Sequence, residues 1–186
     1  MKLRFSWLAL AVLATPVAHA TPHHAHWHYQ IGARANTGQI FAKQLWWEAS
    51  QPGELSLELA HVNAVDMARL AREIGDWVAA TEATSRPEDV ARIELPLQVM
   101  TQESARLAAA ADALAKLVAD AIPEGPDEET RTQIAWRATV LFHGFRTVLA
   151  QHKRAELALG IPVPEDPPAV KHAGDEDAVP EIGMAH

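Results

Sequence analysis

Apolar side chains recur every three or four residues along most of the chain, which is the spacing of one face of an α-helix. Three long helices are predicted, one from the chain break at residues 50–53 to about residue 81 and two at about residues 85–122 and 127–160, with a short one at about residues 36–49. No stretch alternates apolar and polar residues with β-branched content, so no sheet is expected. The pattern predicts an all-α fold, an elongated antiparallel helical bundle of three long helices plus one short helix.

Residues at the ends of these segments match known helix-boundary signals. Asn36 with Gln39, and Ser85 with Glu88, have the spacing of a capping box, in which two side chains satisfy orphan N–H groups at a helix start. Gly160 is a typical stop signal, because glycine readily adopts the left-handed conformation that follows many helices. The boundaries therefore support the same four helices as the periodicity.

The predicted core consists of the apolar positions on the inner face of each long helix. Polar residues on or beside these faces, Asn63, Asp66 and Glu103, need partners there, because burying an unpaired carboxylate is costly. Arg137 or Arg146 is expected to pair with them, and the alternative is a metal site made by Asp66, Glu103 and an inward His. The predicted core positions are Leu59, Val62, Leu70, Ile74, Trp77, Val78, Ile93, Leu97, Met100, Leu107, Leu114, Val118, Ile134, Ala138, Leu141, Phe145, Val148 and Leu149.

Residues 1–20 have the pattern of a secretory signal peptide. Lys2 and Arg4 precede an apolar stretch over residues 5–14, and Ala18-His19-Ala20 has the small-x-small form of a cleavage site. The apolar stretch is too short to cross a bilayer as a helix, and no later stretch is longer. We therefore expect a periplasmic or secreted protein with no membrane span after cleavage.

The segments on either side of the predicted bundle have a different composition. Residues 21–35 are predicted to form a flexible His-rich N-terminal arm, with an extra turn or two on the first helix as the alternative. Residues 161–186 contain several Pro residues and an excess of acidic residues, so a disordered acidic, Pro-rich C-terminal tail is expected. The bundle domain itself is predicted at residues 36–160.

Composition excludes several classes of function. The 186 residues include 24 acidic and 16 basic side chains, and a net charge of −8 does not favour binding to nucleic acid. The chain has no Cys, which excludes disulfides, thiolate metal sites, iron–sulfur clusters and covalently attached c-type haem. No Gly-rich phosphate loop, G-x-S-x-G or H-E-x-x-H motif is present, so a non-enzymatic protein is predicted.

Histidine is the residue type that points to a specific chemistry. The unperturbed pKa of imidazole is about 6.5, so the side chain is largely neutral at pH 7 and able to coordinate Cu(II), Ni(II) or Zn(II). The alternative is a solvated His-rich arm with incidental metal affinity. Four histidines near the predicted mature N-terminus are the candidate metal ligands: His23, His24, His26 and His28. Residues near the C-terminus are candidate additional ligands: His172, Met184 and His186.

A second candidate site combines methionine and histidine on the inner or flanking positions of the helices. In an up-down bundle, Met67 is predicted at the level of His143, and Met100 near His152. A Met/His pair across a helical bundle resembles the haem ligation of soluble b-type cytochromes and would imply a haem b electron carrier. The alternative is that the methionines fill gaps in the core and the inward histidines make hydrogen bonds.

The sequence thus leaves three hypotheses for function. The first is a protein of the cell envelope that binds Cu, Ni or Zn through its His-rich segment and buffers the ion or passes it on. The second is a b-type haem electron-transfer bundle. The third is a cofactor-free interaction or chaperone-like bundle that binds another envelope protein. Trp46-Trp47 would provide an exposed aromatic patch for it, and the alternative is that these two residues cap the bundle.

Overall fold

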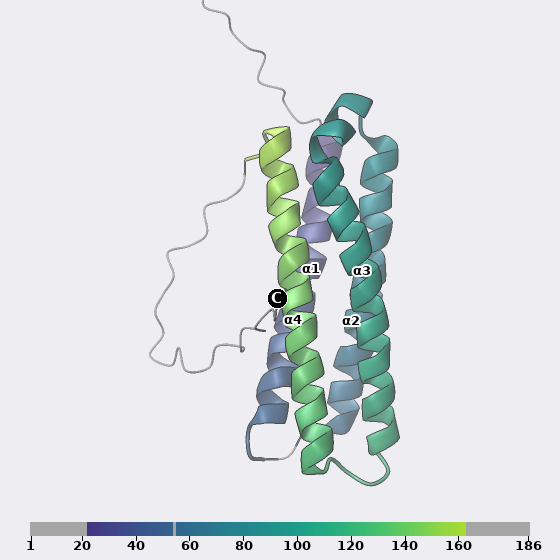
Figure 1. Cartoon of the computed structure of the whole chain (residues 1–186), viewed down its shortest axis with the longest axis vertical. Coiled ribbons are helices and arrows are strands. Elements are labelled where there is room, and N and C mark those ends of the chain that lie inside the picture. Colours follow the sequence, from purple (N-terminus) through teal and green to yellow (C-terminus); the bar gives the residue numbers. More distant parts are fainter. Residues whose placement is uncertain (1–21, 54, 163–186) are drawn as a thin grey trace, which may run out of the picture.

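The computed structural model describes residues 22–53 and 55–162, with residues 22–26 and 28 described by their backbone alone. This part of the chain is a bundle of four helices and contains no strand, which confirms the predicted all-α bundle. The helices are α1 (Pro22–Ser50), α2 (Leu57–Thr84), α3 (Pro87–Ala121) and α4 (Glu128–Leu159) (Figure 1).

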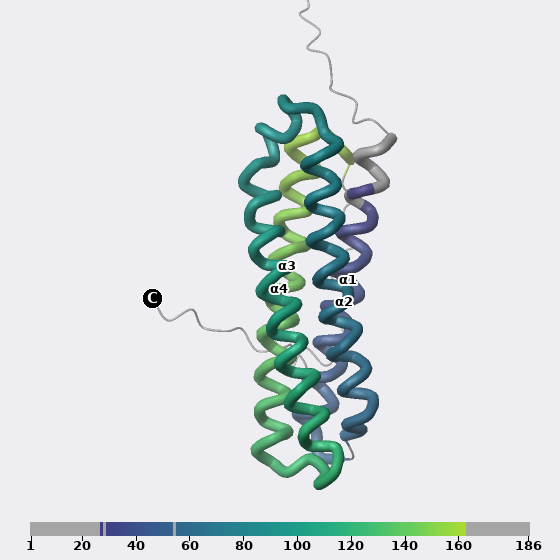
Figure 2. The backbone as a smooth tube through the Cα atoms, turned by 90° about the vertical axis from the view of Figure 1, so that its right-hand side faces the viewer, coloured from purple at the N-terminus to yellow at the C-terminus, as the bar shows by residue number. Residues whose placement is uncertain are grey.

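The helices run alternately up and down, so that each is antiparallel to the next. Helix α1 packs against α2 and α4, and α3 packs against the same two helices from the other side (Figure 2). The helices have 28 to 35 residues. At a rise of 1.5 Å per residue they are about 40–50 Å long, so the bundle is elongated.

The first helix is much longer than predicted. It has 29 residues and begins at Pro22, so the short helix expected at residues 36–49 is corrected to a long one, and its backbone continues through residues 22–35, where extra helical turns were the alternative to a flexible arm. Ile31 and Ala35 are completely buried, because they extend the inner face of this helix by further turns. Asn36, predicted to be a cap, is an exposed residue within the helix. The bundle therefore has four long helices.

The connection between α2 and α3 also differs from the prediction. Ser85 ends α2, where its N–H donates to the carbonyl of Thr81 at 3.0 Å, and Arg86 is the residue that precedes α3. Pro87 occupies the first turn of α3, where its missing N–H leaves no hydrogen bond unmade. The Ser85–Glu88 capping box is thus wrong, because the link between the two helices is too short for Ser85 to begin α3.

Both predicted boundaries of the last helix are confirmed. The Asp127 side chain accepts a hydrogen bond from the Thr130 N–H at 2.7 Å, and this bond lowers the pKa of Asp127. Gly160 ends α4 with φ of 71°, a conformation that glycine adopts without steric cost.

The buried face of α2 is made largely of small residues. Leu59 and Val62, predicted to be in the core, are 43% and 53% exposed, whereas Ala60 and Ala64 on the same turns are completely buried. Alanine on the inner face lets neighbouring helices approach closely, so the larger residues lie at the outer edge of the packing. The six predicted core positions of α3 are all buried.

Two predicted segments lie outside the described residues: the signal peptide, 1–20, and residues 163–186 of the tail. Ile161 and Pro162, which follow α4, are not helical. Within the described part of the chain, none of the helices combines the length and the apolar character needed to cross a membrane.

Candidate functional site

The four candidate histidines belong to the first two turns of α1. A helix turns by about 100° per residue, so His24 and His28 occupy positions about 40° apart around its axis, and His23 and His26 positions about 60° apart. The two pairs of positions fall on different sides of the helix.

The positions of His24 and His28 continue the buried row of α1. The buried residues Ala35 and Ile31 are four residues apart, position 28 is three residues before Ile31, and position 24 is four residues before position 28. These intervals are the spacing of one face of an α-helix. Gly32, one turn after His28, lies directly against His152 of α4, where an added Cβ would be 3.0 Å from the His152 Cε1 atom. The turn of α1 that contains Gly32 is thus in direct contact with α4.

Glu156 is the next residue of α4 along this interface. Because α1 and α4 are antiparallel, one turn back from Gly32 in α1 corresponds to one turn forward from His152 in α4. The first step leads to His28 and the second to Glu156. Glu156 is thus one turn nearer than His152 to the end of α4.

His152 and Glu156 form a buried pair on α4. The His152 Nε2 and Glu156 Oε1 atoms are 3.5 Å apart, and their side chains are only 8% and 14% exposed. Burial raises the pKa of the Glu156 carboxyl, and the positive charge of Lys153 offsets part of this effect. An imidazole and a carboxylate so close together, shielded from water, are donors suited to a divalent transition-metal ion.

Trp27 attaches the His-rich turns of α1 to the bundle. Its ring packs on Trp77 of α2 with the two centroids 4.7 Å apart, and the Arg34 guanidinium lies 5.5 Å from the centre of the Trp77 ring. This aromatic contact lies between His26 and His28 in the sequence. The start of α1 is therefore held against α2 by a specific packing contact as well as by its own hydrogen bonds.

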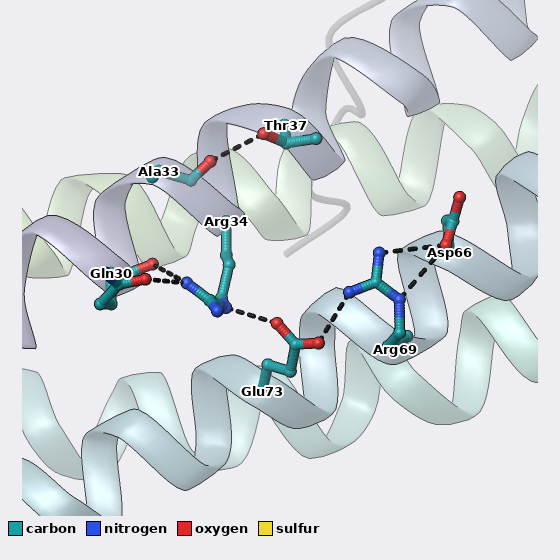
Figure 3. Close-up of polar contacts among 7 residues, drawn as sticks. All are labelled: Gln30, Ala33, Arg34, Thr37, Asp66, Arg69 and Glu73. Atoms are coloured by element: carbon teal, nitrogen blue, oxygen red, sulfur yellow. Dashed lines mark hydrogen bonds and ion pairs between the residues drawn. The ribbon is translucent and has the colours of Figure 1, made fainter.

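A ladder of charged side chains continues from Arg34 along the α1–α2 interface (Figure 3). Arg34 donates to Glu73 at 2.5 Å, Arg69 donates to the other Glu73 oxygen at 2.7 Å, and Arg69 also contacts Asp66 at 3.1 Å. Burial raises the pKa of Glu73, but the hydrogen bonds and charges of the two arginines outweigh it and leave that pKa below its usual value. Each carboxylate of this ladder thus pairs with at least one arginine.

The predicted pairing of Asp66 and Glu103 with Arg137 or Arg146 is wrong, and the alternative, a metal site with an inward His, is not formed by the described side chains. Asp66 pairs with Arg69 and Glu103 with Arg106, both within their own helices, and neither pairs with the arginines that the sequence suggested. Among the side chains that the structure describes, no group of three His, Asp or Glu residues is close enough to hold an ion. Asn63 is buried as expected, and its Nδ2 atom has no hydrogen-bond partner within the described residues.

The methionines and histidines of the haem hypothesis lie at several places in the bundle. Met67 and Met100 are completely buried, which agrees with their predicted inward positions. His152 is also buried, against Gly32, whereas His143 is half-buried with its ring 5.3 Å from that of Phe142. Haem ligation by a Met/His pair stays a prediction.

The opposite end of the bundle is closed by one arginine. Arg131 of α4 donates to the backbone carbonyls of Glu48, Gln51 and Gly53, at 3.2, 2.5 and 3.0 Å. These bonds satisfy carbonyls at the end of α1 and in the loop that follows it. Trp47 beside this loop is 39% exposed.

Sequence reasoning placed His152 inside the bundle but missed Glu156. The available signal was the spacing of four residues between them, which puts both side chains on one face of a helix. No protein-family model, curated protein or solved structure matches the chain.

Proposed function

We propose that this is a non-enzymatic protein of the cell envelope that binds Cu, Ni or Zn through His23, His24, His26 and His28, and that buffers the ion or passes it on. The observation that carries the proposal is the helical backbone from Pro22, which gives His24 and His28 the spacing of four residues. The secretory pattern of residues 1–20 supports the location in the periplasm or outside the cell.

Two imidazoles four residues apart on a helix are well arranged to bind one ion. Such positions are neighbours on one helix face, so both rings reach the ion without a change in the backbone. The chain has no thiolate, so imidazole is its strongest ligand for these metals. The Trp27–Trp77 contact supports the proposal because it limits the loss of conformational entropy when an ion binds at the start of α1.

The first test is elemental analysis of the untagged protein, purified from the periplasm, for Cu, Ni, Zn and Fe. Near-stoichiometric Cu, Ni or Zn supports the proposal, and stoichiometric Fe favours the haem alternative. Titration of the purified chain with each ion by calorimetry then gives its affinity. A protein that carries no metal and does not bind any of these ions in the titration overturns the proposal.

Paired substitutions identify the ligands. The double variant His24→Ala/His28→Ala is expected to weaken binding by about tenfold or more, and His23→Ala/His26→Ala by less. His61→Ala and His143→Ala are matched controls, because these residues lie on helices α2 and α4 and are not part of the segment. Unchanged affinity in both double variants would contradict the assignment.

A cofactor-free interaction bundle is the second candidate, and exposed apolar side chains favour it. Ile40 of α1 is 56% exposed, and Leu59, Val62 and Val65 of α2 are each more than 40% exposed. Such residues are typical of surfaces that bind another protein. Co-purification of one envelope protein, lost on substitution of Val62 and Val65 by Ser, together with the absence of metal, would favour this candidate.

A further inference from the structure

We propose that the outer face of α4 is an interaction surface, and that its occupant is the acidic segment of the same chain that follows the helix, residues 165–181. The inference goes beyond the proposed function and does not depend on metal binding. The face combines cations with exposed apolar side chains: Trp136, Arg146, Lys153, Arg154 and Leu157.

Helix α4 differs in charge from α2 and α3. It has five basic and three acidic side chains, and no acid lies between Glu129 and Glu156. Helix α2 has two basic and five acidic side chains, and α3 has three basic and six acidic ones. Residues 163–186 contain six acidic side chains and one basic one. This segment is therefore attracted to α4 and repelled by α2 and α3.

Two arginines of this face are exposed and form no ion pair with the carboxylates that the structure describes. Arg154 contacts only the neutral side chain of Gln151 among the described residues, at 3.4 Å, and Arg146 is exposed one turn after His143 on the same helix. The exposed Arg72 of α2, in contrast, pairs with a carboxylate of α3. The positive charge of α4 is thus available to an acidic segment.

The apolar residues of the face give it a second kind of contact. Trp136 is 62% and Leu157 is 67% exposed, which leaves most of each side chain in water. The segment after α4 also contains apolar residues among its acids, including Val179 and Ile182. Its docking would therefore remove apolar surface from water as well as pair charges.

The turn at the end of α4 keeps the chain against the bundle. The Gly160 N–H donates to the Leu157 carbonyl at 3.1 Å, and the Ile161 N–H donates to the Glu156 carbonyl at 2.9 Å. These bonds, with the left-handed Gly160, turn the chain off the helix axis. Ile161 then packs against the core, so the acidic segment starts at the end of α4 that carries Arg154.

The spacing of the acids matches the spacing of the cations. The pair Glu165-Asp166 lies within about 13 Å of the last described residue in an extended chain, and the run at residues 175–177 within about 50 Å. Along α4, Arg154 is about 9 Å and Arg146 about 21 Å from Gly160. Both acidic groups can therefore reach a cation, and attachment to α4 gives the segment an effective concentration of about mM.

The test uses a nitroxide spin label on the mature chain, residues 21–186. The chain has no Cys, so Ala178→Cys gives one labelling position, beside the acidic run. In NMR spectra at low salt, the label is expected to broaden the amide signals around Arg146 at least about threefold more than those around Arg69 of α2, and about 0.5 M NaCl is expected to remove the difference.

Matched variants identify the surface. Arg146→Gln/Arg154→Gln is expected to abolish the extra broadening on α4. Arg72→Gln/Lys116→Gln removes the same charge from α2 and α3 and is expected to keep it. Carbodiimide, which joins a carboxylate to a nearby amine, is expected to crosslink the segment to Lys153 and not to the exposed Lys116. Circular dichroism of each variant checks that it is folded.

Three results would overturn the inference. Equal broadening of the α4 and α2 signals at low salt, or none on either helix, would show that the segment does not dock on α4. Extra broadening that survives in Arg146→Gln/Arg154→Gln would assign the contact to another surface. A mixture of spin-labelled unlabelled-nitrogen chain with ¹⁵N chain lacking the label tests the occupant, because broadening there as strong as within one chain would assign the face to a second copy. The first comparison, at low and high salt, does not depend on how the charge variants fold.

Discussion

Helix α1 packs against α4 through glycine and against α2 through long charged side chains. At the α4 interface, Gly38 faces the ring of Phe145, and an added Cβ would lie 2.5 Å from its carbon atoms. At the α2 interface, Arg34 reaches Glu73 and lies over the ring of Trp77. One helix therefore has a close, apolar contact on one side and a more open, polar contact on the other.

The two kinds of contact differ in the substitutions and the buried polar groups that each interface tolerates. A close contact between backbones leaves no space for an added methyl group, and it shields the polar groups between the helices from water. This is where the buried His152–Glu156 pair lies. Long charged side chains instead stay partly hydrated, and each contributes only modestly to stability. The α1–α4 interface is thus suited to a buried site, and the α1–α2 interface to fixing the position of α1.

A change of pH should have the strongest effect, on metal binding by the histidines at the start of α1. Lowering the pH from 7 to 5 protonates imidazole and is expected to weaken zinc affinity by about a hundredfold or more, since at least two imidazoles are required. Calorimetric titration at several pH values measures this, and circular dichroism at pH 5 checks that the bundle is intact. An affinity independent of pH would exclude histidine ligands.

Gly38→Ala tests how close the α1–α4 contact is. The new methyl group must displace the Phe145 ring, so the free energy of unfolding is expected to fall by about 2 kcal/mol, even though alanine favours helix more than glycine. Gly75→Ala is the matched control, because its Cβ would meet only the Ser104 side chain, at 3.2 Å. Urea unfolding measures both variants. Equal stabilities would show that this interface is not tighter than the rest of the bundle.

Arg34→Ala tests the α1–α2 interface in the same way. It removes an ion pair and a cation–π contact, and the free energy of unfolding is expected to fall by about 1 kcal/mol. Arg72, which pairs with Asp112 at the surface, provides the control, and Arg72→Ala is expected to have a smaller effect. Urea unfolding at low and high salt measures the free energy of unfolding of both variants. A loss in Arg34→Ala no larger than that in Arg72→Ala would contradict the role given to Arg34.

The smallest expected effect is the dependence of the Glu73 ladder on pH. The pKa of Glu73 is lowered in the folded protein, so its contribution is complete above the ordinary glutamate pKa of about 4.3. It is lost as the pH falls below that value through the folded pKa. The stability difference between the wild type and Glu73→Gln should therefore narrow between pH 6 and pH 3, as measured by urea unfolding. A constant difference would mean that charge at Glu73 does not stabilise the α1–α2 interface.

Local signals in the sequence were enough for much of the fold. Asp127 and Gly160 bound α4 as predicted, because an N-cap side chain and a left-handed glycine act within one turn of the chain. The predicted core of α3 is buried because its large apolar residues all lie on one face of the helix. The chemistry of the candidate ligands was also available, since the absence of Cys leaves imidazole as the main metal donor.

Other features depended on contacts between helices. The start of α1 at Pro22 was missed because its first turns contain few large apolar residues, and they pack on α2 through Trp27 and on α4 at Gly32. The exposure of Leu59 and the burial of Ala60 followed from how closely the neighbouring helices approach, which periodicity does not specify.

Residues close together along the chain account for the four helical segments, their strongest boundaries and the kind of ligand the chain offers. The contact of Gly32 with His152, and the position of Glu156 beside His152, arise only where α1 and α4 pack together. Those relations depend on the register and spacing of α1 and α4, which begin about a hundred residues apart in the chain. That spacing is set by the packing of glycine and alanine between the helices, so it could not be obtained from either helix alone.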